Sequence, residues 1–134
     1  MGAWGVGNFD NDTACDWAYE LEECTDLSVI ENSINAALNE SYIDSDIGSE
    51  ALAAIDTLAR LKGNSGVKNS YTEAVDSWVA SRKIDVPNEL IEKSQKVLSL
   101  IITDSSELHE LWAESEDSEN WKEEIRLLES RISA

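Results

Sequence analysis

The stretch MGAWGVGNFDNDTACDW, residues 1–17, decides the fold of this chain. It brings glycines, tryptophans and aspartates together in one short segment. Glycine adopts backbone conformations that other residues avoid, so Gly5 and Gly7 permit a tight turn. We expect this turn to let Trp4 and Phe9 pack into the core or beside the first helix. The segment therefore predicts a structural clasp, since its glycines lack the strand and the lysine of a phosphate-binding loop.

The first helix is expected directly after this clasp. Asp10 or Asp12 can cap it, because a short carboxylate accepts hydrogen bonds from the free N–H groups of the first turn. Apolar residues then follow a 3.6-residue period and predict the buried face; they are Ala14, Trp17, Ala18, Leu21 and Cys24. The opposite face predicts an acidic, solvent-facing ridge of Asp12, Asp16, Glu20 and Glu23.

The rest of the chain shows the same helical period and no sustained alternation typical of strands. We expect a loop at 41–50, a helix end at Gly63, and a helix capped by Asp104 with Glu107 three residues later. The predicted fold is all-α: a single domain, residues 1–134, with about six or seven short helices after the glycine-rich clasp. The remaining helices are expected at about 27–39, 49–62, 71–82, 87–102, in the region after Asp104, and from 118 onward.

The five tryptophans divide into two groups. Trp17, Trp78 and Trp121 lie on apolar helical stripes, which predicts that they pack in the core. Trp4 and Trp112 are less determined by their surroundings. Because aromatic residues are enriched in protein interfaces, one of these two is a candidate for contact with a partner.

The net charge of −18 restricts the partners of this chain. Residues 1–59 contain thirteen Asp and Glu and no Lys or Arg, so this part alone carries a charge of −13. Nucleic acid and anionic membranes are disfavoured, because binding to phosphate requires a basic surface. The charge favours a cationic partner. The alternative is that the acidic surface serves solubility alone.

No pattern of residues predicts a catalytic or metal site. An EF-hand loop that starts at Asp10 needs Gly at its sixth position and Glu at its twelfth, where this chain has Cys15 and Leu21. His109 is the only histidine, so neither a catalytic triad nor a metal site with several histidines is expected. We therefore expect no catalytic residue, no metal and no cofactor.

The cellular compartment is expected to be the cytoplasm. No basic segment precedes an apolar run, as a signal peptide requires, and no stretch approaches the roughly 20 apolar residues of a membrane-spanning helix. Cys15 and Cys24 fall on what we expect to be one helix, roughly 13 Å apart along its axis, which is too far for a disulfide.

The opening segment resembles the start of a bacterial family, the domain of unknown function family 4259, whose members begin M-G-x-W-G-x-G-x-F-D-N-D-x-A-x-D. The later segment SSELHELWAESEDSENW is similar to a motif near the carboxyl end of that family. The resemblance implies a small helical domain, and it supplies no catalytic residue. Some small acidic proteins of this kind accompany secreted toxins as immunity partners. The matching residues are Met1, Gly2, Trp4, Gly5, Gly7, Phe9, Asp10, Asn11, Asp12, Ala14 and Asp16.

The leading hypothesis is a non-catalytic binding protein that neutralises a cationic partner, as the immunity protein of a bacterial toxin such as a nuclease. Complementary charge would speed association and could fill a basic substrate cleft with carboxylates. The residues expected to contact the partner are Asp16, Glu20, Glu23, Glu110, Glu114, Glu116 and Asp117.

Two alternatives remain open. One is a metal-assisted hydrolase that uses Asp10, Asp12 and Asp16. The other is a housekeeping helical domain whose opening motif is purely structural.

Overall fold

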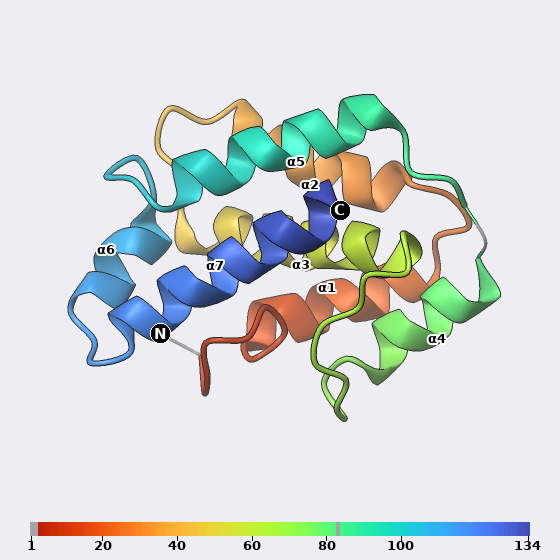
Figure 1. Ribbon diagram of the computed structural model, residues 1–134, viewed down its shortest axis with the longest axis horizontal. Helices are drawn as coiled ribbons and strands as arrows, with labels where there is room; N and C mark the ends of the chain where they lie inside the picture. The colour runs from red at the N-terminus through yellow and green to blue at the C-terminus, as the bar shows by residue number, and fades with distance from the viewer. Residues whose placement is uncertain (1–2, 83) are drawn as a thin grey trace.

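The computed structural model describes residues 3–82 and 84–134, which form seven helices (Figure 1). This confirms the all-α prediction. The only β-type pairing in these residues is two isolated bridges, Ala3 with Asn11 and Ile43 with Ser106. The helices are α1 (Asp12–Glu22), α2 (Ser28–Leu38), α3 (Ser45–Leu61), α4 (Glu73–Ser81), α5 (Asn88–Ile101), α6 (Glu107–Ala113) and α7 (Ser118–Ser133).

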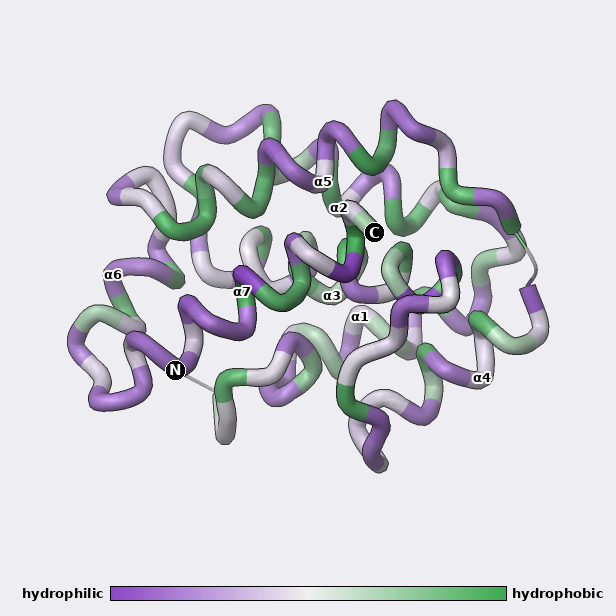
Figure 2. Tube along the Cα trace, in the orientation of Figure 1, coloured by the Kyte–Doolittle hydropathy of each residue, from purple (hydrophilic) through white to green (hydrophobic). Residues whose placement is uncertain are grey.

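The central element is α3, which contacts each of the other six helices. Every residue from Ala51 to Arg60 is buried, so this helix is covered on all sides. Its small alanines allow the neighbouring helices to approach closely. By contrast, hydrophobic and hydrophilic residues alternate along the outer helices α5 and α7, as expected for helices with one face in solvent (Figure 2).

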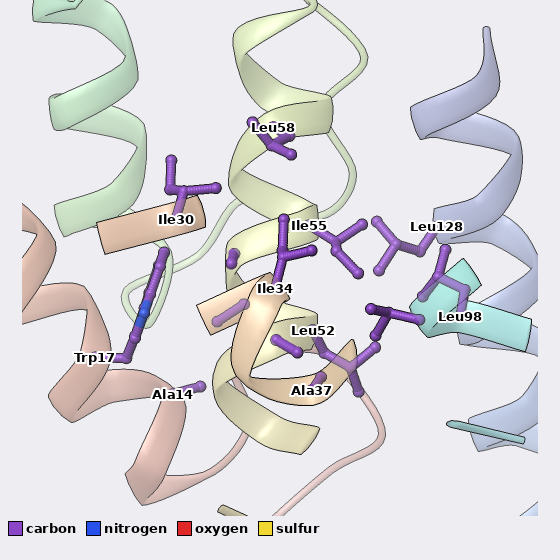
Figure 3. Close-up of a cluster of buried hydrophobic side chains, with 14 of the residues drawn as sticks. Ala14, Trp17, Ile30, Ile34, Ala37, Leu52, Ile55, Leu58, Leu98 and Leu128 are labelled. Carbon is purple, nitrogen blue, oxygen red and sulfur yellow. The ribbon is translucent and has the colours of Figure 1, made fainter. Parts of the chain in front are cut away.

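The core gathers around α3 from several directions (Figure 3). Trp17 of α1, Trp78 of α4 and Trp121 of α7 are each at most 3% exposed, which confirms the prediction for these three tryptophans. Truncating a fully buried Leu or Ile in such a core costs about 2–5 kcal/mol. The core residues labelled in Figure 3 are Ala14, Trp17, Ile30, Ile34, Ala37, Leu52, Ile55, Leu58, Leu98 and Leu128.

The start of α3 lies earlier than the sequence predicted. Residues 45–50 were expected in a loop, but they form the first turns of this helix. The reason is a cap that the polar composition concealed: the carboxylate of Asp44 accepts a hydrogen bond of 2.8 Å from the N–H of Ile47. At the other end, Gly63 has a φ of +86°, which confirms it as the residue that ends the helix.

Two other predicted caps are wrong. Asn11, and neither Asp10 nor Asp12, caps α1 by accepting a bond of 2.8 Å from the N–H of Ala14. Ser106, and not Asp104, caps α6 through the N–H of His109. In both cases the capping residue is neutral and lies one or two positions from the predicted aspartate. Its backbone has the extended conformation that a cap requires.

The two cysteines do not share a helix, because α1 ends at Glu22 and Cys24 follows it. Both Cys15 and Cys24 are free thiols of intermediate burial. None of the helices in the described part of the chain is long and apolar enough to cross a membrane.

Candidate functional site

The seven predicted contact residues are all exposed. None of them forms an ion pair with a Lys or Arg within residues 3–82 and 84–134. Their charges are therefore not neutralised by the described part of the chain. They are Asp16 and Glu20 on α1, Glu23 just after it, Glu110 on α6, and Glu114, Glu116 and Asp117 in the connection from α6 to α7.

The beginning of α3 joins the two predicted groups. On one side, the hydroxyl of Thr13 on α1 donates a bond of 3.2 Å to Asp46. On the other side, the N–H of Ser45 donates a bond of 2.7 Å to Glu107 of α6. Sequence reasoning missed this connection, because it placed residues 45–50 in a loop. We call the resulting region the acidic surface; it comprises Asp16, Glu20, Asp44, Asp46, Glu50, Glu107 and Glu110. It includes three of the seven predicted contact residues, and Glu23, Glu114, Glu116 and Asp117 are not part of it.

Like charges crowd the acidic surface. The pKa of Glu50 is raised by burial first, and then by the negative charges of Glu20, Asp46 and Asp44. A hydrogen bond from the Tyr42 hydroxyl to Glu110, together with burial and the neighbouring carboxylates, raises the pKa of Tyr42 to about 12. The carboxylates of this surface therefore repel one another.

The N-terminal loop is closed by Asp10. Its carboxylate accepts a bond of 3.1 Å from the N–H of Gly7, and its own carbonyl accepts one of 2.9 Å from the N–H of Trp4. A Cβ atom at Gly5 or Gly7 would lie 2.6 or 2.7 Å from the Asp10 carboxylate. The predicted tight turn is present, but the glycines are needed for this close approach and neither has a positive φ.

The two aromatic residues expected to anchor the clasp behave differently. Phe9 is 2% exposed and belongs to the core, as predicted. Trp4 is 47% exposed, so it does not pack in the core, which was one of the two placements expected for it. It packs instead against the exposed ring of Tyr71, with ring centroids 5.0 Å apart. Two tryptophans were considered for contact with a partner. Trp112 is buried against Trp121, so Trp4 is the remaining candidate of the two.

The other members of the opening motif have structural positions. Asn11 caps α1, Asp12 is its first residue and Trp17 is buried within it. Gly2 lies outside the described residues.

A network of buried charges lies beneath this loop. Asp56 and Arg60 on α3 are 3% and 4% exposed and form an ion pair of 2.9 Å. The Asp56 carboxylate also accepts bonds from Arg131 of α7 and from the side-chain amide of Asn8, the latter at 2.9 Å. Arg60 in turn donates to Asp76 at 2.8 Å. Asp56 therefore ties α3 to the N-terminal loop and to α7, and Arg60 extends the network to α4.

Sequence reasoning missed this network. The signal was present, since Asp56 and Arg60 are charged residues four apart within the alanine-rich segment 51–60. Charged residues are almost never fully buried unless they are paired, so their placement on a central helix implies partners elsewhere. The sequence alone does not indicate that those partners are Asn8, Asp76 and Arg131.

A cavity of about 370 Å³ opens beside the network, and we call it the motif cavity because the opening motif forms one wall. The N-terminal loop and the connection from α3 to α4 lie next to each other here, close to α7 (Figure 1). The charged residues that line it are Asp10, Asp56, Arg60, Glu124 and Arg131. Its apolar lining includes Phe9, Val67 and Leu127, of which the last two are 71% and 48% exposed.

The three aspartates of the hydrolase hypothesis, Asp10, Asp12 and Asp16, lie close enough to the thiol of Cys15 to affect its pKa. The pKa of Cys15 is raised by burial and then by the charges of Asp12, Asp16 and Asp10. In the part of the chain that the structure describes, no three His, Cys, Asp or Glu side chains form a group that could hold a metal ion. The imidazole Nδ1 of His109 lies 3.7 Å from a carboxylate oxygen of the exposed Asp104.

Comparison with known proteins places the chain by family alone. No curated protein and no solved structure matches it. The family model described as Domain of unknown function (DUF4259) matches residues 2–124, which cover the opening motif from Gly2 onward and all the helices except the end of α7. The chain therefore belongs to this family, DUF4259.

Proposed function

We propose that the protein is a non-catalytic binding protein that captures a cationic protein through its acidic surface, as the immunity partner of a bacterial toxin such as a nuclease. The observation that carries this proposal is the set of exposed carboxylates on α1, α3 and α6 that have no cationic partner within the described residues. Repulsion among them is relieved when a basic surface approaches.

The arrangement suits a partner that itself binds a polyanion. A nuclease has a basic cleft for phosphates, and a row of carboxylates on helices presents comparable negative charge to that cleft. After burial, the charges of Glu20, Asp46 and Asp44 contribute to the raised pKa of Glu50, which is evidence of repulsion within this surface. The same charge steers the two proteins together, so association is fast and depends on salt.

The test is co-expression of the chain with the toxin domain encoded by an adjacent gene, with cell growth as the measurement. We expect growth to be rescued by the wild-type chain and lost with the double reversal Glu20→Lys/Glu110→Lys. The matched control is Glu92→Lys, which changes an exposed glutamate on α5, away from the acidic surface. Absence of a toxin gene, or rescue by the double reversal at full strength, would contradict the immunity role.

A further inference from the structure

The two arginines of the motif cavity are already engaged within the chain. Arg60 donates to Asp56, to Asp76 and, at 2.7 Å, to the carbonyl of Val67. Arg131 donates to Asp56 and, at 2.8 Å, to the carbonyl of Asn64. Their charges are thus balanced by Asp56 and Asp76, and the cavity does not offer an anion a free guanidinium pair.

Two carboxylates of the cavity remain without a cation. Neither Asp10 nor Glu124 forms an ion pair with a Lys or Arg of the described residues. Burial raises the pKa of Glu124, as do the charges of Asp56 and Asp10, whereas Arg131 lowers it. The charged lining consists of three carboxylates, Asp10, Asp56 and Glu124, and two arginines, which leaves a net charge of −1. Asp76, which pairs with Arg60 from outside the lining, adds a fourth carboxylate to the network.

Asn8 adds an acceptor that lacks a donor. Its side chain lines the motif cavity and is 7% exposed. Its amide nitrogen donates to Asp56, but its Oδ1 atom is buried and has no hydrogen-bond partner among the described residues. Buried acceptors are seldom left in this state, because the loss of water is then uncompensated. A donor that enters the cavity would provide what is missing.

The mouth of the cavity is apolar. Val67 and Leu127 line it and are 71% and 48% exposed. The exposed ring of Tyr71 lies on the same connection from α3 to α4 as Val67 and packs against Trp4 of the N-terminal loop. Arginine and lysine side chains combine an apolar stem with a cationic head. A pocket with an apolar rim and an acidic interior is complementary to that combination, and aromatic residues beside it are typical of interface centres.

We propose that the motif cavity receives an arginine or lysine side chain of the partner protein, with its cationic head at Asp10 and Glu124 and its stem against Leu127 and Val67. This inference rests on the proposed function, because the side chain comes from the cationic partner. It adds a defined anchor point to the diffuse attraction of the acidic surface. The volume of about 370 Å³ is at the lower end of the range for ligand pockets, roughly 300–1,000 Å³.

The test uses N-acetyl-arginine N-methylamide as the probe and the neutral analogue N-acetyl-citrulline N-methylamide as its control. Both are titrated into the ¹⁵N-labelled chain, and the backbone amide signals are followed by NMR. We expect saturable shifts at Gly7, Gly66 and Val67 with the arginine probe alone. Equal shifts with citrulline would overturn the proposal, as would arginine shifts confined to the acidic surface.

A pair of variants on α7 sharpens this test. Glu124→Gln should weaken arginine binding by about tenfold, because a charge-assisted hydrogen bond is lost. Glu119→Gln, the same substitution at a position where the side chain is 80% exposed, should bind as the wild type does. Glu124→Gln removes a partly buried charge, so it is expected to fold. Equal binding by the two variants would overturn the proposal.

The two proposals fail in different ways. If the chain neutralises its toxin but does not bind the arginine probe in the motif cavity, the cavity proposal is wrong and the proposed function stands. If the probe binds in the cavity but no toxin is neutralised, the proposed function is wrong. The cavity then remains a site for a basic side chain of some other protein.

Discussion

Asp56 and Arg60 form an ion pair across one turn of the most buried helix of the protein, with a separation of 2.9 Å. Both side chains are almost fully buried, so each depends on polar groups that other segments supply. Those groups come from the N-terminal loop, from α4 and from α7. The pair therefore acts as the point at which the opening motif is joined to the helical core.

Removing one partner of this network should destabilise the fold strongly. We expect Asp56→Asn to lower the free energy of unfolding by about 3–5 kcal/mol, because Arg60 and Arg131 lose their shared carboxylate in a buried site. The matched control is Glu123→Gln, which breaks an exposed pair with Arg126 and should cost less than about 1 kcal/mol. Urea denaturation of both variants measures the difference. Similar losses in the two would contradict a structural role for the network.

The close approach of the Asp10 carboxylate to Gly7 leads to a second prediction. We expect Gly7→Ala to lower the free energy of unfolding by about 1–3 kcal/mol, since the new Cβ atom would lie 2.7 Å from the Asp10 carboxylate. In the double variant Gly7→Ala/Asp10→Ala the clash is absent, so the two losses should not add. Thermal melts of the two single variants and the double variant form the cycle. Additive losses would show that the contact is not the reason for glycine at this position.

Much of the fold follows from the sequence because the helices are amphipathic. The stripe of Ala14, Trp17, Ala18 and Leu21 on α1 is buried as the 3.6-residue period predicts. The helix starts were less predictable, because a cap depends on the backbone conformation of one residue. Asp44 was passed over within a polar run, although its carboxylate starts α3.

The site was only partly predictable for a different reason. Exposure of Asp16, Glu20 and Glu110 follows from their place on the polar side of a helix. The motif cavity instead depends on which segments meet in space. Asn8, Asp56 and Arg131 are far apart in the sequence, and no local pattern connects them. The charge of the acidic surface can therefore be predicted from the sequence, whereas the cavity can be found only in the tertiary structure.

The crowding of Glu50 predicts a dependence of stability on pH. Its pKa in the folded protein is raised above the ordinary value of 4.5, so the folded state binds this proton more tightly than the unfolded state does. The free energy of unfolding therefore falls as pH rises from 4.5 through the folded pKa, and the loss persists at neutral pH. We expect Glu50→Gln to raise the melting temperature at neutral pH and to remove this part of the pH dependence.

The control for this measurement is Glu92→Gln, at an exposed position on α5. It should leave both the melting temperature and its pH profile close to those of the wild type. If the two variants have the same profile, the raised pKa of Glu50, which burial and the neighbouring carboxylates cause, does not contribute to the pH dependence of stability.

The contrast between Phe9 and Trp4 separates the structural part of the opening motif from its exposed part. Phe9 is 2% exposed and lies under Arg60, whose guanidinium carbon is 5.8 Å from the ring centroid. We expect Phe9→Ala to lower the free energy of unfolding by about 3–5 kcal/mol. Trp4→Ala removes a ring that is 47% exposed and contacts Tyr71, so it should cost about 1 kcal/mol or less.

Trp4 should matter for binding of the partner, although it matters little for stability. With Trp4→Ala, we expect a weaker complex with a cationic partner at nearly unchanged stability, because Trp4 is an exposed aromatic of the N-terminal loop that forms one wall of the motif cavity and contributes apolar contact area. Calorimetric titration with the partner and a thermal melt of the same sample measure both quantities. An affinity equal to that of the wild type would show that Trp4 lies outside the interface. A large loss of stability would instead return this residue to the core-anchoring role that the sequence first suggested.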